Sequence, residues 1–140
     1  LKSGDLVSDG VTYDVFHKAI QEAKDEGFSN VIVDGFPRTK AQAEWLSKYM
    51  DMNDDRIDLV IVLEVPESEI MKRLELRGRM EDTPETIAKR MAIYRQKMYP
   101  VLGLFAEQHI KIVHIDGTGT VGEVHDKIQA EIEASGIGSQ

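Results

Sequence analysis

Two side chains of opposite charge follow a short apolar run and could together bind an anion and a metal ion. Residues 31–33 read Val-Ile-Val, which predicts a strand buried on both faces. Pro37 forbids further regular pairing, so the Asp34 carboxylate and the Arg38 guanidinium come just beyond the strand end. Ligands of open α/β sheets bind at the carboxyl ends of strands, which predicts a site at this position.

Four arginines gather around a later helix turn, and they could bind an oxyanion: Arg73, Arg77, Arg79 and Arg90. Arg73 and Arg77 are four residues apart and share one helix face. A solvated helix with ion pairs is the simpler interpretation, because several glutamates are close by. Four guanidinium groups around one turn of an acidic protein favour phosphate recognition instead, because the arginine fork matches phosphate oxygens.

The elements that must position these residues alternate between helical spacing and apolar runs. Such alternation predicts βαβ units and a parallel sheet with helices on both faces, in one domain without an internal linker. The expected strands are 31–33, 59–65 and 110–115. The expected helices are 11–23, 40–49, 67–76, 84–98, 101–108 and 121–132, with Pro100 separating the fourth from the fifth.

Composition excludes several classes of function. A net charge of −8 over 140 residues argues against a nucleic-acid-binding surface. No apolar run is long enough to cross a membrane, and no signal peptide is recognisable. The chain has no cysteine, which excludes disulfides and thiolate metal sites and fits a cytoplasmic setting.

Three motifs together resemble adenylate kinase, a family of nucleoside monophosphate kinases. They are D-G-F-P-R-T-K-A-Q at 34–42, R-L-E-L-R-G-R-M-E-D-T-P-E-T-I-A-K-R-M at 73–91 and I-D-G-T-G-T at 115–120. The resemblance covers nearly the whole chain in order, and the first motif is highly specific. It implies a P-loop-kinase-like three-layer α/β fold and transfer of the γ-phosphoryl group of ATP to AMP, with Mg²⁺ as cofactor.

Carried over residue by residue, the resemblance implies a role for each matching position. The AMP-binding residues would be Val7, Gly35, Arg38, Gln42, Arg79 and Arg90. The ATP-binding residues would be Arg73, Arg77, Asp116, Gly117 and Thr118. Arg38, Arg73, Arg79 and Arg90 would stabilise the transferring phosphoryl group, and Asp34 would hold Mg²⁺ through water. A single glycine separates Arg77 from Arg79, which implies a short lid over residues 73–90.

One motif of the family does not occur in the 140 residues. The family begins with a strand and a G-x-x-x-x-G-K-[ST] loop, the P-loop, whose backbone N–H groups and lysine cradle the ATP phosphates. The resemblance places that first strand between residues 31–34 and 59–65. We therefore expect an N-terminally incomplete domain, in which residues 1–10 end the monophosphate-binding segment. Alone it would be inactive, and joined to its N-terminal segment it would be a monomer.

Two alternatives remain open on the sequence. A UMP/CMP-type kinase is the first, because Gln42 suits either type and the choice of base depends partly on the segment that is missing here. The second is a non-catalytic nucleotide-binding or interaction module derived from the same fold. The retained arginines argue against the second alternative, whereas the absent P-loop sequence argues for it.

Overall fold

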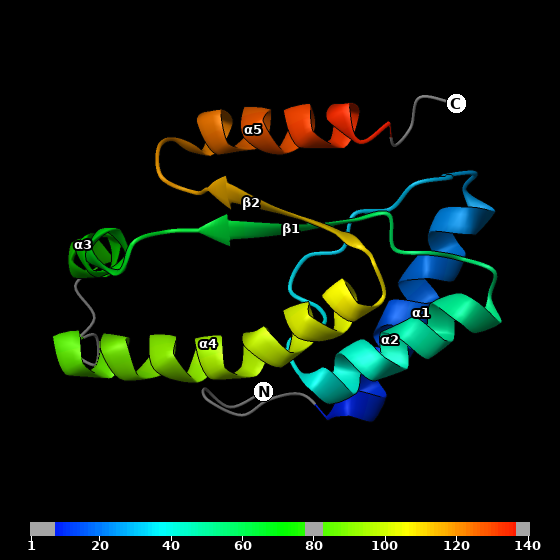
Figure 1. The fold of residues 1–140 in the computed structure, drawn as a ribbon, viewed down its shortest axis with the longest axis horizontal. Helices are drawn as coiled ribbons and strands as arrows, with labels where there is room; N and C mark the ends of the chain where they lie inside the picture. The colour runs from blue at the N-terminus through cyan, green and yellow to red at the C-terminus, as the bar shows by residue number, and fades with distance from the viewer. Residues whose placement is uncertain (1–7, 78–82, 137–140) are drawn as a thin grey trace. The chain divides into compact units, whose positions relative to one another are not determined.

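The computed structural model describes residues 8–77 and 83–136, with the backbone alone for residues 74–77. Figure 1 shows the elements in chain order. The helices are α1 (Asp9–Asp25), α2 (Lys40–Met52), α3 (Glu67–Arg77), α4 (Pro84–Glu107) and α5 (Val121–Ala134). The strands are β1 (Leu59–Glu64) and β2 (Lys111–Asp116).

The described residues form two compact units, 8–36 and 37–136. The first unit is built on α1, whose inward face buries Phe16 and Ile20. The Phe36 ring returns to this face, with its centroid 5.1 Å from that of Phe16 and 6.3 Å from that of Tyr13. An aromatic cluster therefore closes the segment that ends just before Arg38.

The second unit has the predicted α/β arrangement. β1 and β2 run parallel, with Leu59 opposite Lys111 and Glu64 opposite Asp116. α4 and α5 both contact β2, and Figure 1 shows them on opposite faces of the sheet. α2 and α3 pack against α4. The prediction of a parallel sheet with helices on both faces is thus confirmed for this unit.

Hydrophobic burial in the second unit joins α2, α4 and β2 around one core. The buried residues are Ala43, Leu46 and Tyr49 of α2, Ile87, Val101 and Phe105 of α4, and Ile115 of β2. Each of these helices begins at a threonine cap, as does α5: Thr39, Thr83 and Thr120 accept the N–H of the residue three positions later. The caps fix where the helices begin, and the core fixes how they pack.

The prediction that Pro100 separates two helices is wrong, because α4 continues through it from Pro84 to Glu107. Proline has no N–H to donate to the carbonyl four residues earlier, which costs about 3 kcal/mol within a helix. Val101 and Phe105, in the turn after Pro100, are both buried. We attribute the continuous helix to this burial, which offsets the lost hydrogen bond.

The predicted strand at 31–33 is also absent, since these residues have no ladder partner and lie outside any strand. Val31, Ile32 and Val33 are 48%, 79% and 43% exposed, so they are not buried on both faces. Strand formation requires a paired backbone as well as apolar side chains. In the described part of the chain, β1 and β2 pair with each other.

None of the helices in the described ranges combines the length and apolarity that a bilayer crossing requires.

Candidate functional site

The start of α2 holds Arg38 in a local network of hydrogen bonds. The Thr39 hydroxyl accepts the Gln42 backbone N–H at 3.2 Å, as a helix N-cap. The Gln42 side chain turns back, and its Oε1 accepts the Arg38 backbone N–H at 2.7 Å. This arrangement is a capping box whose return bond reaches one residue beyond the cap. The guanidinium of Arg38 therefore extends from the positive end of a 13-residue helix, which favours anions.

Thr39 is absent from the predicted site residues, although its sequence signal was present. Thr39 and Gln42 have the T-x-x-Q spacing of a capping box. That spacing could have identified both the helix start and the second role of Gln42, which the resemblance assigned to the base alone.

The same helix is attached to α4, so its start does not depend on the cap alone. Ala43 is fully buried, and Leu46 is buried one turn later. Ser47 and Gln108, the C-cap residue of α4, exchange two side-chain hydrogen bonds of 3.2 and 3.0 Å. Arg38 thus precedes a helix that packs into the core of the second unit.

Three of the four predicted lid arginines, Arg73, Arg77 and Arg90, lie on α3 and α4, which contact each other. In α3, the Arg73 Nε donates to Glu69 Oε1 at 3.3 Å, and both side chains are more than a third exposed. Such surface pairs contribute about 0.3–0.5 kcal/mol, so a phosphate can replace the glutamate. Arg90 is exposed on α4, while Arg77 lies in the last turn of α3. Arg79 falls outside the described residues.

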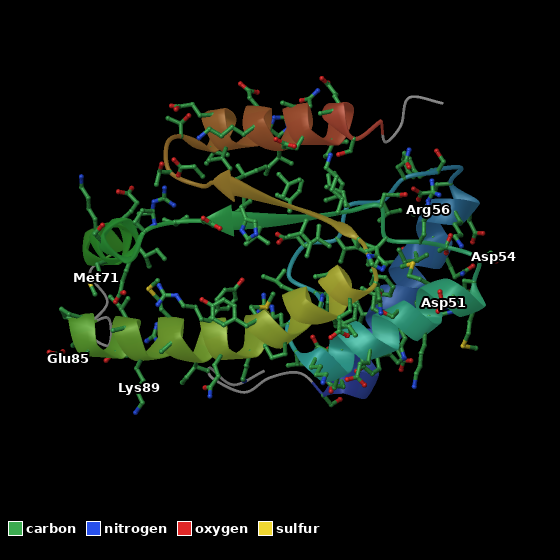
Figure 2. The ribbon with its side chains drawn as sticks, viewed as in Figure 1. Asp51, Asp54, Arg56, Met71, Glu85 and Lys89 are labelled. Atoms are coloured by element: carbon green, nitrogen blue, oxygen red, sulfur yellow. The ribbon has the colours of Figure 1, made fainter. Side chains whose placement is uncertain are left out.

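Figure 2 shows the side chains where α3 and α4 meet, with Met71, Glu85 and Lys89 labelled. Met71 is half-buried and lies on the side of α3 that faces the start of α4. Glu85 and Lys89 extend from α4 one turn apart, toward solvent. One half-buried apolar side chain thus lies where the two helices meet, and two charged groups lie on the outer surface of α4.

The end of β2 and the loop after it contain three of the predicted ATP-binding residues, Asp116, Gly117 and Thr118, and the loop is closed by hydrogen bonds. Asp116 Oδ1 accepts the Thr118 backbone N–H at 2.9 Å and the Thr118 hydroxyl at 2.6 Å. The Gly117 N–H donates to the Glu64 carbonyl at 2.8 Å, which joins the loop to the end of β1. Asp116 is therefore a turn-forming residue of the Asx type, which fixes the loop.

Hydrogen bonds within this loop favour the ionised form of Asp116. The Thr118 hydroxyl is the main reason that the pKa of the Asp116 carboxyl lies below its ordinary value, and the Thr118 N–H adds to this effect. Lys127 of α5 lowers the pKa further, while partial desolvation acts in the opposite direction. The Lys127 Nζ also donates to the Asp116 carbonyl at 3.2 Å. The sequence gives no sign of this role for Lys127, because a lone helix lysine carries no distinguishing pattern.

Asp34 and Gly35 belong to the first unit, where both are exposed. Gly35 has φ of 80°, a conformation that glycine adopts without strain. Within the described ranges, no three His, Cys, Asp or Glu side chains form a metal-binding group. A lone exposed carboxylate nevertheless fits Mg²⁺, which keeps several waters and takes one or two carboxylates together with substrate phosphates. Val7 lies outside the described residues.

An open groove of about 530 Å³ lies between the end of α2, the following loop and the start of β2. Figure 2 labels Asp51, Asp54 and Arg56 in this part of the molecule. Arg56 is paired with Asp58 at 2.7 Å. The residues that line the groove include none of those predicted for nucleotide binding, so the candidate site is not this groove.

Comparison with known proteins matches residues 1–110 to the family model described as Adenylate kinase. An adenylate kinase of Thermus thermophilus is 35% identical over 136 residues, covering 94% of this chain and 69% of the relative. One from Maricaulis maris is 36% identical over 137 residues, covering 95% and 71%. One from Caulobacter vibrioides is 37% identical over 142 residues, covering 99% and 73%.

Proposed function

This chain belongs to the adenylate kinase family, and from that premise we propose that its residues 38–42 bind AMP as the acceptor of a phosphoryl group from ATP. The chain is a phosphotransferase of the nucleoside monophosphate kinase class. In the proposed reaction, an oxygen of the AMP phosphate forms a bond to the γ-phosphorus of ATP. The bond from that phosphorus to the β–γ bridging oxygen breaks, which gives two molecules of ADP.

The observation that carries the proposal is the geometry at the start of α2. Arg38 stands at the positive end of a helix, and its backbone is held by the Gln42 side chain at 2.7 Å. A guanidinium in this position suits the doubly charged phosphate of a monophosphate. Gln42 lies one helical turn further on, where its amide can reach the base of the same nucleotide.

The donor half of the proposed site comes from three later segments. Asp116, Gly117 and Thr118 form a closed loop that would pack against the adenine of ATP. Arg73, Arg77 and Arg79 would contact the ATP phosphates, and Arg90 the transferring group.

The AMP pocket would be completed by Arg79, Arg90, Gly35 and Val7. Asp34 would hold Mg²⁺ through water, and the bound ion would neutralise phosphate charge.

Phosphoryl transfer needs little covalent chemistry from the protein. It needs two nucleotides held in line and donors fixed where negative charge develops. Arg38 would be such a fixed donor, because its backbone is held at the start of a capped and packed helix and would not need to reorganise during the reaction. Exclusion of water by the short lid would protect ATP from hydrolysis.

Substitution of Arg38 by alanine tests the proposal. With a P-loop segment joined to the chain, we expect kcat/KM for AMP to fall by about 10²–10³-fold, as when one fixed donor to developing charge is removed. Arg56→Ala is the matched control, because Arg56 is exposed and paired with Asp58 away from the candidate site. Near-normal turnover in Arg38→Ala, or an equal loss in Arg56→Ala, would show that the acceptor site lies elsewhere.

AMP binding should be measured by calorimetry alongside turnover, because the 140 residues contain no G-x-x-x-x-G-K-[ST] sequence. We keep the prediction that the 140 residues alone lack family-like turnover, and family-like turnover by the purified 140-residue chain would contradict it. The cytoplasmic setting and the monomeric state also remain predictions.

A further inference from the structure

We propose that Gln42 is a positioning residue for Arg38, so that one side chain links the base-binding and phosphate-binding parts of the acceptor site. The inference rests on the proposed function, because it assigns Gln42 a second role within that site. The observation is the 2.7 Å hydrogen bond from the Arg38 backbone N–H to Gln42 Oε1. A contact with the base alone would not require this bond.

The direction of the hydrogen bond gives it a mechanical consequence. The Gln42 backbone is held in the first turn of α2, where its own N–H donates to the Thr39 hydroxyl at 3.2 Å. The half-buried Gln42 side chain then holds the backbone of Arg38, which precedes the helix cap. The exposed guanidinium of Arg38 is therefore carried by a backbone that is hydrogen-bonded to the first turn of the helix.

The packing of α2 just after the cap allows the Gln42 side chain to hold the Arg38 backbone in place. Ala43, next to Gln42, is fully buried, and Leu46 is buried one turn further on. The glutamine is therefore fixed at its root by the contact of α2 with α4. Loss of its oxygen would release the Arg38 backbone without changing the charge of the site or the guanidinium itself.

A ligand without a base separates the two roles of Gln42. Ribose 5-phosphate presents a phosphate to Arg38 but no base, so a side chain that only reads the base cannot affect its binding. Gln42→Met keeps the length of the side chain and removes the acceptor oxygen. We expect this variant to bind ribose 5-phosphate about 3- to 10-fold more weakly, the range expected for one lost hydrogen bond.

A double-mutant cycle shows whether the effect passes through Arg38. With Arg38→Ala already present, Gln42→Met should leave the remaining affinity for ribose 5-phosphate unchanged. Gln129→Met is the matched control, because Gln129 is an exposed glutamine of α5 that pairs with Glu133. Equal affinities of wild type and Gln42→Met would overturn the proposal, as would the same loss from Gln42→Met in both backgrounds.

Amide hydrogen exchange at Arg38 distinguishes failure of this inference from failure of the proposed function. The Arg38 amide should exchange about 3- to 10-fold faster in Gln42→Met than in wild type, with or without nucleotide. If the protein binds neither AMP nor ribose 5-phosphate while the exchange rates differ, the proposed function fails and the backbone link stands. Equal exchange rates would overturn the link itself.

Discussion

Residues 31–35 and residues 112–117 are close in composition but differ in how their backbones are paired. The first segment reads V-I-V-D-G and the second I-V-H-I-D-G, so each consists of β-branched apolar residues followed by Asp-Gly, with His114 as the one exception. The second forms most of β2 and pairs with β1 along its length. The first lies outside the strands of the described structure. The difference teaches that such a run becomes a strand only where a partner backbone is available.

The glycines of the two segments also serve different needs. Gly35 has φ of 80°, which favours glycine because other residues are strained there. Gly117 is required by space, since an added Cβ would lie 2.8 Å from the Val65 Cγ2 and 3.6 Å from the Leu63 Cβ. One glycine makes a turn possible, and the other lets the loop approach the neighbouring strand.

The largest expected effect comes from truncating one isoleucine in each of the two segments. Ile115 is 6% exposed, and Ile115→Ala should lower the free energy of unfolding by about 2–5 kcal/mol. Ile32 is 79% exposed, and Ile32→Ala should change it by less than about 0.5 kcal/mol. Urea unfolding followed by circular dichroism measures both changes, with the slopes compared to detect a changed denatured state.

A similar loss from both substitutions would break the comparison. It would mean that residues 31–33 are buried in the protein in solution, as the sequence predicted. A small effect of both substitutions would instead place Ile115 outside the core.

The sequence predicts elements well where the signal is local. The start of α4 follows from Thr83 as a cap, Pro84 in the first turn and Glu85 beside them, and the structure confirms it. The paths of residues 31–33 and Pro100 depend on distant packing and pairing, which a local pattern does not contain. The second role of Gln42, by contrast, has a local signal in the T-x-x-Q spacing of a capping box.

For the candidate site, the sequence indicates residue types, their spacing and their partners within a few residues, but not their partners on other elements. Glu69 beside Arg73 could be inferred from the four-residue spacing. The two bonds from Thr118 to Asp116 could be inferred from an Asx turn. The contact of Lys127 with the Asp116 carbonyl joins residues eleven apart on different elements, so it needs the fold.

Substitution of Gly117 by alanine gives the next largest effect. The new Cβ would lie 2.8 Å from Val65 Cγ2, a branched side chain with little freedom to move away. We expect a loss of about 1–3 kcal/mol in the free energy of unfolding, the usual cost of overpacking. Gly103→Ala is the matched control, because Gly103 has nothing within 4 Å and lies inside α4. That control should gain about 0.5–1 kcal/mol, and a stable Gly117→Ala protein would show that the loop can move away from β1.

The threonine caps sharpen the comparison, because each segment leads into a helix through the same device. Thr39 caps α2 and Thr120 caps α5, each through its hydroxyl. Thr39→Ala and Thr120→Ala should each cost about 0.5–2 kcal/mol in thermal or urea unfolding. Thr→Ser at either position keeps the hydroxyl and should cost much less. If Thr39→Ala alone is neutral, the segment before α2 differs from its counterpart in its cap as well as in its pairing.

The smallest effect is a pH dependence at the end of the second segment. The pKa of Asp116 lies below its ordinary value of 3.8, mainly because the Thr118 hydroxyl donates to the ionised carboxylate. The unfolded chain therefore binds the proton more readily than the folded chain. The resulting stabilisation is complete above the ordinary pKa and is lost as the pH falls through the lowered one.

Thr118→Val removes that hydroxyl, so the pKa of Asp116 should rise toward 3.8 and the pH dependence of stability should flatten below it. A carboxyl carbon NMR titration measures the pKa, and urea midpoints at several acidic pH values measure the stability. Thr12→Val is the matched control, because the Thr12 hydroxyl donates to the Ser8 carbonyl within the first unit. An unchanged pKa in Thr118→Val would mean that the backbone N–H alone holds the carboxylate. The turn after β2 would then rest on the Thr118 backbone N–H rather than on the Thr118 hydroxyl.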